Sequence, residues 1–431
     1  DMNDEEREPG TRAVHAGASP DGATGARATP IHQTTSYVFE DAETAADLYA
    51  LEAEGHVYSR VSNPTVATLE ARLAALEGGV DAVATASGMG ALDAATTVLA
   101  SVGDNVVSSS DVYGGTRGYL SRIADRRGVE ARFVDTLDYD AYAETIDEDT
   151  AYVHVETIGN PSLVTPDLER IAEIAHERGT PLFVDNTFGT PVLCRPIEHG
   201  ADIVWESTTK WIHGSGTTIG GMLIDGGTFP WATHAEQYPE IARPNPSFDG
   251  TRFTEAFGDR AFAVAARHRG TRAVGHAQSP FDAWQTLQGI ETLPLRMERH
   301  CENALAVAEF LADHDAIEWV TYPGLDSHPT HDTASEYLDG GFGGVVAFGP
   351  VGGFQAAKEL CESVELTSFL ANIGDAKTLI IHPASTTHAG LTTEEQRESG
   401  VHPDMIRLSV GIEDPGDIIA DLDRGLREVD A

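Results

Sequence analysis

Seven short apolar runs alternate with helical patterns between Asp81 and Ile224, and no other feature of the sequence constrains the fold as much. The runs are Ala82–Thr85, Asn105–Ser108, Ala131–Val134, Tyr152–Glu156, Leu182–Asp185, Ile203–Glu206 and Gly221–Ile224. Most of them are separated by helical patterns such as Ala91–Ala100, Thr116–Arg127 and Leu168–Arg178. Strands that alternate with helices predict an α/β fold with a mostly parallel sheet and helices on both of its faces.

Small and polar residues follow several of these strands, at the edge where such a sheet binds its ligands. The turn Ser87-Gly88-Met89-Gly90 follows the first strand and opens a helix. Its backbone N–H groups suit a phosphate, although plain turns often have the same composition. Tyr113 follows the second strand, and such a tyrosine either stacks on a planar ring or fills a core. Asn160 belongs to the polar run that follows the fourth strand.

An aspartate and a lysine end the next two strands. Asp185 comes directly after Leu-Phe-Val, and a buried carboxylate needs a positive partner such as a protonated pyridine nitrogen. Lys210 follows the sixth strand among the hydroxyls of Ser207, Thr208 and Thr209. A buried lysine has a lowered pKa and becomes a nucleophile, so this stretch suggests a Schiff base with pyridoxal phosphate (PLP). A solvated lysine in a Ser/Thr loop is the alternative, but the two strand ends together favour a cofactor site.

The segments on either side of the sheet are less regular. Residues 1–60 are polar with short helical stretches such as Ala42–Glu54, so we expect an arm that lies on something else. Residues 225–280 suggest a loop-rich insertion, and a long helical pattern runs from Pro280 to Phe310. A smaller α+β segment follows, with predicted strands at Trp319–Tyr322, Gly344–Phe348, Leu379–Ile381 and Met405–Val410 and a closing helix from Pro415. Arg407 in the last strand either grips a carboxylate or forms an internal salt bridge.

Composition narrows the class of protein. The chain has 69 Asp and Glu residues against 28 Lys and Arg, a formal net charge of −41, which disfavours nucleic acid and anionic membranes as partners. Because the acidic excess is scattered, we expect a surface adapted to high salt. Three cysteines without a CxxC pair, no long apolar run and no signal peptide suggest a cytoplasmic protein. His328, His331 and His382 form no convincing metal site, and we expect them at the surface.

Eight motifs, taken in order, resemble the Cys/Met-metabolism family of PLP-dependent enzymes. They are YSRVSNPT, ASGMGA, VYGGT, ETIGNP, VDNTF, STTKW, HPASTTHAGL and RLSVGIE, and the resemblance extends from about Thr11 to Leu426. It implies the aspartate-aminotransferase-like fold (fold type I), with a mostly parallel seven-stranded sheet and a smaller α+β C-terminal domain. The implied divisions are an arm that contacts a neighbouring subunit (1–65), a PLP-binding large domain (66–282) and a small domain (283–431).

The resemblance also implies roles for individual residues. The implied catalytic residues are Lys210, which binds the cofactor and acts as the base, Asp185, which holds the pyridine nitrogen protonated, and Tyr113, which stacks on the ring. The implied cofactor-binding set is Tyr58, Arg60, Ser87, Gly88, Met89, Tyr113, Asn160, Asp185, Ser207, Thr209 and Lys210, and the implied substrate-binding set is Asn160, Ser385 and Arg407. Tyr58 and Arg60 would reach the phosphate in a neighbouring subunit, so the resemblance implies shared active sites and a dimer of dimers. No metal is expected.

Within the family the sequence is most similar to the O-acetylhomoserine sulfhydrylases. The insertion after Lys210 and the runs Gln288–His300 and Asn372–His388 resemble that branch. Lys377 stands about where cystathionine enzymes have a glutamate, and Gly115 where methionine γ-lyases usually have a cysteine. We therefore expect replacement of the acetoxy group of O-acetylhomoserine by sulfide or methanethiol. Cystathionine γ-synthase or γ-lyase and methionine γ-lyase are the alternatives, and a non-catalytic PLP-fold scaffold is disfavoured because Lys210, Asp185, Tyr113 and Arg407 are all present.

Overall fold

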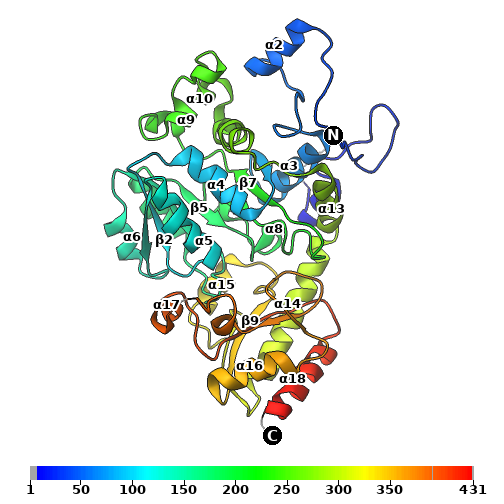
Figure 1. Cartoon of the computed structure of the whole chain (residues 1–431), viewed down its shortest axis with the longest axis vertical. Coiled ribbons are helices and arrows are strands. Elements are labelled where there is room, and N and C mark those ends of the chain that lie inside the picture. The colour runs from blue at the N-terminus through cyan, green and yellow to red at the C-terminus, as the bar shows by residue number, and fades with distance from the viewer. Residues whose placement is uncertain (1–6, 391, 430–431) are drawn as a thin grey trace.

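The computed structural model describes residues 7–390 and 392–429, and its main element is a seven-stranded sheet (Figure 1). The strands are β1 (Asp81–Thr85), β2 (Asn105–Ser109), β3 (Glu130–Val134), β4 (Thr150–Glu156), β5 (Leu182–Asp185), β6 (Ile203–Glu206) and β7 (Gly221–Asp225). Their order is β1-β7-β6-β5-β4-β2-β3. β7 runs antiparallel to β1 and β6, and all other pairs are parallel. The predicted strands and the mostly parallel sheet are confirmed.

Helices cover both faces of this sheet, as predicted. The helices are α3 (Pro64–Glu77), α4 (Gly88–Leu99), α5 (Gly114–Gly118), the π-helical turn η2 (Tyr119–Ala124), α6 (Tyr139–Thr145), α7 (Leu168–Glu177), α8 (Thr190–Leu193) and the 3-10 turn η3 (Pro196–His199). Neighbouring strand residues alternate between two cores: Val184 and Val204 belong to the core under α3 and α7, whereas Phe183 and Trp205 belong to the core under α4. This alternation follows from the two-residue period of a strand.

The segment that follows β7 differs from its prediction. Instead of loops it forms short helices: η4 (Trp231–His234), α9 (Pro239–Ala242), η5 (Pro246–Phe248), α10 (Phe253–Ala256), η6 (Gly258–Arg260), α11 (Ala261–Ala265), η7 (Ala266–Thr271) and α12 (Arg272–Val274). Buried aromatic rings such as Trp231, Tyr238 and Phe262 hold these helices against the α4 side of the sheet. The helices are too short to produce a helical period in the sequence, which explains the error.

A second sheet lies at the other end of the molecule (Figure 1). Its order is β10-β11-β12-β9-β8. The strands are β8 (Ile317–Thr321), β9 (Val345–Pro350), β10 (Ser368–Phe369), β11 (Leu379–Ile381) and β12 (Ile406–Ser409), and the helices around them are α15 (His331–Tyr337), α16 (Gly353–Ser363), η8 (Pro383–Ser385), α17 (Thr393–Glu398) and α18 (Pro415–Val429). Two-residue β10 was not predicted; the other four strands and the closing helix were.

Two helices connect the sheets where the sequence predicted one continuous pattern. α13 (Pro280–Ile290) ends before α14 (Leu293–Ala312) begins. Pro294 stands in the first turn of α14, where its missing N–H costs nothing, whereas inside a continuous helix it would remove a hydrogen bond. None of the helices in the described residues is long and apolar enough to cross a membrane.

The N-terminal arm extends away from the rest of the chain, with α2 at the top of Figure 1. α1 (Pro9–His15) packs on α3, and Arg12 donates a hydrogen bond to the carbonyl of Ala75 (3.1 Å). α2 (Ala42–Ala50), in contrast, has no buried residue. The contact of this arm with a second subunit and the boundaries 1–65, 66–282 and 283–431 stay predictions.

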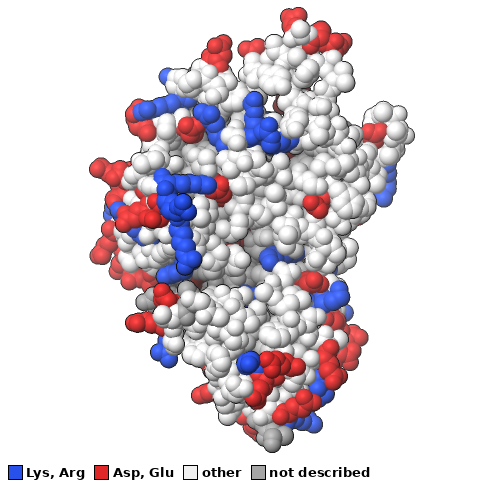
Figure 2. Space-filling view, viewed as in Figure 1, with Lys and Arg blue, Asp and Glu red and all other residues white. Residues whose placement is uncertain are grey.

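Charged side chains are unevenly distributed over the visible face (Figure 2). Acidic groups are spread along its outline, and Lys and Arg side chains gather over the region of α5 and η2. The centre of this face has few charges, although the chain as a whole carries a formal charge of −41. Adaptation to high salt stays a prediction.

Candidate active site

A cavity of about 960 Å³ lies between the carboxyl ends of the large-sheet strands and the C-terminal sheet. The wall that follows the large-sheet strands is called the floor here, and its residues are Ser87, Gly88, Met89, Glu156, Asp185, Thr187, Trp205, Ser207, Thr209 and Lys210. The wall from the C-terminal part of the chain is called the roof, and its residues include Ala371, Asn372, Ile373, Thr387, His388 and Arg407. Tyr113 and Asn160 complete the lining between the two walls.

Lys210 lies at the centre of the floor, in the turn after β6. Its Nζ donates a hydrogen bond to Oδ1 of Asn372 in the roof (2.6 Å). Burial, aided by the positive charge of Arg407, lowers the pKa of Lys210 to about 8. About a tenth of this amine is therefore uncharged at pH 7, far more than for an ordinary lysine, and the uncharged form is the one that acts as a nucleophile or a base.

Arg296 fixes the turn that carries Lys210. Its guanidinium is buried and donates hydrogen bonds to the carbonyls of Trp211 (2.7 Å), Ile212 (3.3 Å) and Gly289 (2.8 Å). Burial lowers the pKa of Arg296 to about 10. The three carbonyls occupy its donors, so this arginine acts as a structural brace.

Asp185 ends β5 and is buried beside the cavity. The backbone N–H of Thr187 donates to its Oδ1 (2.9 Å), and burial raises its pKa to about 6. Among residues 7–390 and 392–429, no Lys, Arg or His forms an ion pair with this carboxyl group. A buried acid without a cation fits a ligand that brings a positive group, such as a protonated pyridine nitrogen.

One corner of the floor fits a phosphate. Ser87 caps α4, and its Oγ accepts the N–H of Gly90 (3.0 Å). A Cβ on Gly88 would lie 2.8 Å from the Cβ of Ser207, so only glycine lets the helix end approach the Ser207 strand end so closely. The Ser207 N–H is held by the hydroxyl of Thr187 (2.9 Å). A helix N-terminus with hydroxyls beside it is a suitable anion site.

Glu156 joins two lining residues, and the sequence analysis did not single it out. It is buried, and its two carboxylate oxygens accept the backbone N–H groups of Tyr113 (2.6 Å) and Asn160 (2.9 Å). Burial and the neighbouring Asp185 raise its pKa well above the ordinary value. A glutamate at the end of an apolar strand beside the Asp185 strand was the signal in the sequence that could have identified it.

Arg407 reaches the cavity from β12. Its Nη1 donates to Oδ1 of Asn160 (3.0 Å), and burial lowers its pKa to about 10. No carboxylate in the described residues pairs with it, so the salt-bridge alternative is not supported. A guanidinium in this position fits the carboxylate of a bound substrate.

Four residues named in the sequence analysis lie away from this cavity. Ser385 is outside the lining, and its Oγ is hydrogen-bonded to Nδ1 of His382 (2.8 Å). Tyr58 and Arg60 lie on the arm, and the Tyr58 side chain is 41% exposed. Arg60 donates a hydrogen bond to the carbonyl of Arg272, which belongs to α12. Lys377 is exposed and does not line the cavity, so the structure does not place it at an acceptor site.

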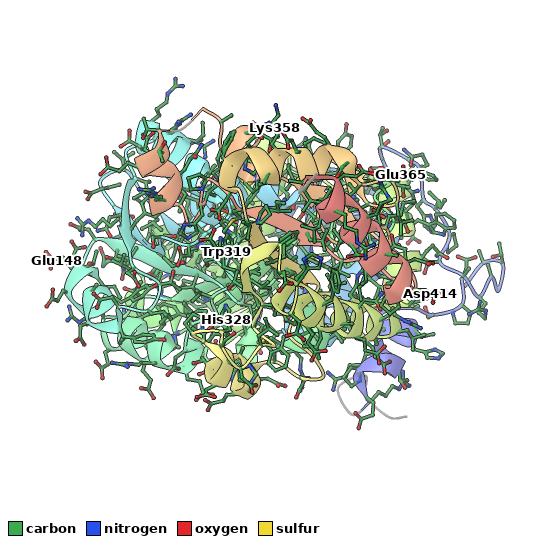
Figure 3. All side chains as sticks on the ribbon, turned by 90° about the horizontal axis from the view of Figure 1, so that it is seen from below. Glu148, Trp319, His328, Lys358, Glu365 and Asp414 are labelled. Atoms are coloured by element: carbon green, nitrogen blue, oxygen red, sulfur yellow. The ribbon has the colours of Figure 1, made fainter. Side chains whose placement is uncertain are left out.

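The surface location expected for two histidines is wrong. His328 and His382 are both buried. The backbone N–H of Thr330 donates to the His328 ring, and the His382 ring is hydrogen-bonded to the carbonyl of Pro403. In Figure 3, His328 and Trp319 lie toward the middle of the view, whereas Glu148 lies at the rim. The described residues contain no group of His, Cys, Asp and Glu suited to a metal ion.

Asn372 and His388 are the roof residues that sequence reasoning missed. Asn372 contacts the Lys210 amine, and His388 lies beside Gly114, with a pKa lowered by burial and by Arg407. Both belong to the Asn372–His388 run that was noted only for its resemblance. Their place in the cavity depends on contacts between distant parts of the chain.

Comparisons with known proteins agree with this geometry. The family model described as "Cys/Met metabolism PLP-dependent enzyme" matches residues 10–427. A homocysteine synthase of Schizosaccharomyces pombe is 50% identical over 96% of this chain and 97% of the relative. An O-acetyl-L-homoserine sulfhydrylase of Leptospira meyeri is 47% identical over 98% and 97%. A solved structure of a putative O-acetylhomoserine (thiol)-lyase of Campylobacter jejuni, 37% identical, superposes with a TM-score of 0.94 over 98% of this chain and 100% of that chain, and it contains N'-pyridoxyl-lysine-5'-monophosphate.

Proposed function

Because the chain belongs to the Cys/Met-metabolism family of PLP-dependent enzymes, we propose that it replaces the acetoxy group on the γ-carbon of O-acetyl-L-homoserine by sulfide, giving homocysteine and acetate. With methanethiol the product is methionine. The observation that carries this proposal is the cavity in which Lys210, Asp185 and Arg407 meet. The names of the relatives at 47–50% identity support the choice of substrate.

The residues of the floor fit PLP. The amine of Lys210 would bind its aldehyde, Asp185 would hold its ring nitrogen protonated, and Ser87, Gly88, Met89, Ser207 and Thr209 would hold its phosphate. The ring of Tyr113 lines the same space. When bound, the cofactor withdraws electrons from the α-carbon of the substrate.

The remaining steps belong to side chains of this protein. Arg407, oriented by Asn160, holds the α-carboxylate of the substrate. Lys210 takes the α-proton away and then removes a proton from the neighbouring β-carbon, for which its lowered pKa is suited, and it returns protons to these carbons after the new bond to sulfur has formed. The acetate then leaves the γ-carbon, and the sulfide adds at the same carbon.

The active unit is a dimer in which each arm contributes to the site of its partner, and two dimers form a tetramer. Tyr58 and Arg60 do not line the cavity of their own chain and are exposed on the N-terminal arm. The charge-poor centre of the face in Figure 2 offers a surface for such a contact in an otherwise acidic protein. We place the enzyme in the cytoplasm, because all three cysteines are free and buried.

A product assay at high salt tests the proposal. O-acetylhomoserine is supplied with and without sulfide, and homocysteine is measured beside 2-oxobutanoate and ammonia. Homocysteine that forms only with sulfide supports the replacement reaction. Release of 2-oxobutanoate without any thiol would make the protein a γ-lyase, and equal rates with the O-succinyl ester would remove the preference for acetyl.

A further inference from the structure

Two glutamates are buried behind the floor, on the side of the strand ends that faces away from the cavity. Glu77 ends α3 and Glu206 ends β6, and both are 0% exposed. Neither lines the cavity, whereas Trp205, the residue before Glu206, does. The proposed reaction uses neither of them.

The carboxyl oxygens of Glu77 and Glu206 that lack a donor indicate a proton between the two side chains. Oε1 of Glu77 accepts the Nδ2 of Asn186 (2.7 Å). The other oxygen of Glu77 and both oxygens of Glu206 receive no hydrogen bond from another group in the described residues, and each of the two carboxyl groups contributes to the pKa shift of the other as a hydrogen-bonding neighbour. Two carboxylates in such a place would repel each other and lose their hydration. A proton on Glu206 that is donated to Glu77 satisfies both groups.

The surroundings explain why Glu77 keeps the negative charge. Asn186 already donates to one oxygen of Glu77, and a proton on Glu206 would give the other oxygen a donor, whereas Glu206 receives none. Arg195 is the cation that acts on Glu77, but it forms an ion pair with Glu198 (2.8 Å). Among the described residues, the two glutamates therefore have no cation paired with them alone. Burial raises the pKa of both glutamates.

The pair adjoins Asp185 through Asn186 and Glu206, each of which stands one residue beyond the position where Asp185 meets Trp205. Asp185 is in register with Trp205, and the N–H of Asn186 donates to the carbonyl of Trp205 (2.9 Å). Asp185 faces the cavity, while Asn186 turns to Glu77, and Glu206 follows Trp205. The charge of Asp185 acts on Glu206. This influence is mutual, because coupled acids titrate together.

We propose that Glu77 and Glu206 share one proton, and that the single negative charge of the pair, held behind Asp185, keeps the cofactor nitrogen that Asp185 binds protonated. The effect on the cofactor nitrogen rests on the proposed function. Both glutamates are positioning residues, because they act through Asp185 and touch neither substrate nor cofactor.

Two variants separate the proton from the charge. Glu206→Gln keeps the donor to Glu77 and the negative charge but removes the titrating proton. The double variant Glu77→Gln with Glu206→Gln has the same shape and no charge. Asp225→Asn is the control: Asp225 is another buried acid, on the adjacent strand β7 and outside the cavity, with a pKa raised by burial to about 7.

The first measurement needs neither cofactor nor substrate. The infrared band of protonated carboxyl groups is compared between the wild type and Glu206→Gln near pH 8, and we expect one protonated carboxyl fewer in the variant. The unfolding midpoint is measured from pH 6 to pH 9. In this pH range the folded wild type keeps a proton that the unfolded chain releases. Its equilibrium constant for unfolding should therefore rise with pH by an additional factor of about ten per pH unit, compared with that of Glu206→Gln. Identical infrared bands and identical pH profiles would overturn the shared proton.

The second measurement is the pH titration of the visible absorbance of the bound cofactor. Glu206→Gln should keep the wild-type midpoint, and the double variant should shift it to lower pH by about one unit, because a nearby negative charge favours the protonated form. Asp225→Asn should leave the midpoint unchanged. An unshifted midpoint in the double variant would overturn the effect on the cofactor. Since these readouts involve no substrate, an error in the proposed reaction leaves them intact.

Discussion

The floor and the roof of the cavity are held in place by different kinds of structure. The floor residues Asp185 and Lys210 follow adjacent parallel strands, so the register of the sheet sets where they lie. The roof residues Asn372 and His388 belong to irregular segments, and a small number of contacts holds them. Floor residues thus sit on a rigid frame, and roof residues depend on how the C-terminal part packs onto it.

Specific contacts join the two walls near Lys210. The N–H of Ala376 donates to the carbonyl of Gly214 (2.9 Å), and a Cβ on Gly374 would lie 2.6 Å from the backbone nitrogen of Trp211. The Lys210–Asn372 hydrogen bond completes this set. The roof therefore touches the floor at the turn of Lys210, where we expect a small change in the loop to affect the proposed chemistry.

The largest effect is expected in the floor, for Lys210→Ala. The variant loses both the group that binds the cofactor and the base, so turnover should fall by roughly 10⁴-fold or more. Folding should be unaffected, because the change removes a buried amine that desolvation makes unfavourable. Product assays and far-ultraviolet circular dichroism check the two halves of this statement. Turnover within tenfold of the wild type would remove Lys210 from the mechanism.

Arg407→Lys tests the main charged group of the roof. A lysine keeps the charge but not the planar pair of N–H donors, so kcat/KM for O-acetylhomoserine should fall by about 100-fold, mostly through KM. Steady-state kinetics measure this, with the absorbance of bound cofactor as the control that the floor is intact. A loss carried by kcat alone would contradict the role of Arg407 as a clamp.

The contact between floor and roof is tested by two changes at Asn372. Asn372→Asp places a carboxylate against the Lys210 amine and should raise its pKa, whereas Asn372→Ala removes an acceptor that favours the ammonium form and should lower it. Because the base must be uncharged, the acidic limb of the rate profile should move up by about one pH unit with Asp, slowing turnover about tenfold near pH 7. The limb reports Lys210, whose pKa in the wild type is about 8.

Lys377→Gln is the matched control for this pair, since Lys377 lies on the same loop but is exposed and outside the cavity. Its pH profile should equal that of the wild type. Shifts of the same sign in Asn372→Asp and Asn372→Ala would show that the loop acts by its shape rather than through the amide.

The two walls also differ in how far the sequence predicted them. Asp185 and Ser207 could be assigned to one edge because alternating strands and helices leave few topologies, and strand ends meet at the ligand-binding edge. No such rule covers Asn372, which meets a lysine 162 residues away through a loop without periodicity. Ser385 is a related case: the resemblance places it near the substrate, its hydroxyl is bonded to His382 outside the cavity lining, and its substrate role stays a prediction. Chain direction after an irregular turn is set by tertiary packing, which a sequence pattern does not encode.

The smallest effect is expected at Gly115, in the wall between floor and roof. An ideal Cβ at this position would lie 2.3 Å from the ring of Tyr113, so Gly115→Cys forces that ring to move. We expect about a fivefold loss of kcat/KM, since the ring is 46% exposed and has room to shift, while Lys210 and Asp185 stay in place. Gly118→Ala on the same helix, where a Cβ meets nothing within 4 Å, is the control and should change little. If Gly115→Cys instead raised thiol-independent release of 2-oxobutanoate, this wall rather than the roof would determine whether the bound substrate is replaced or eliminated.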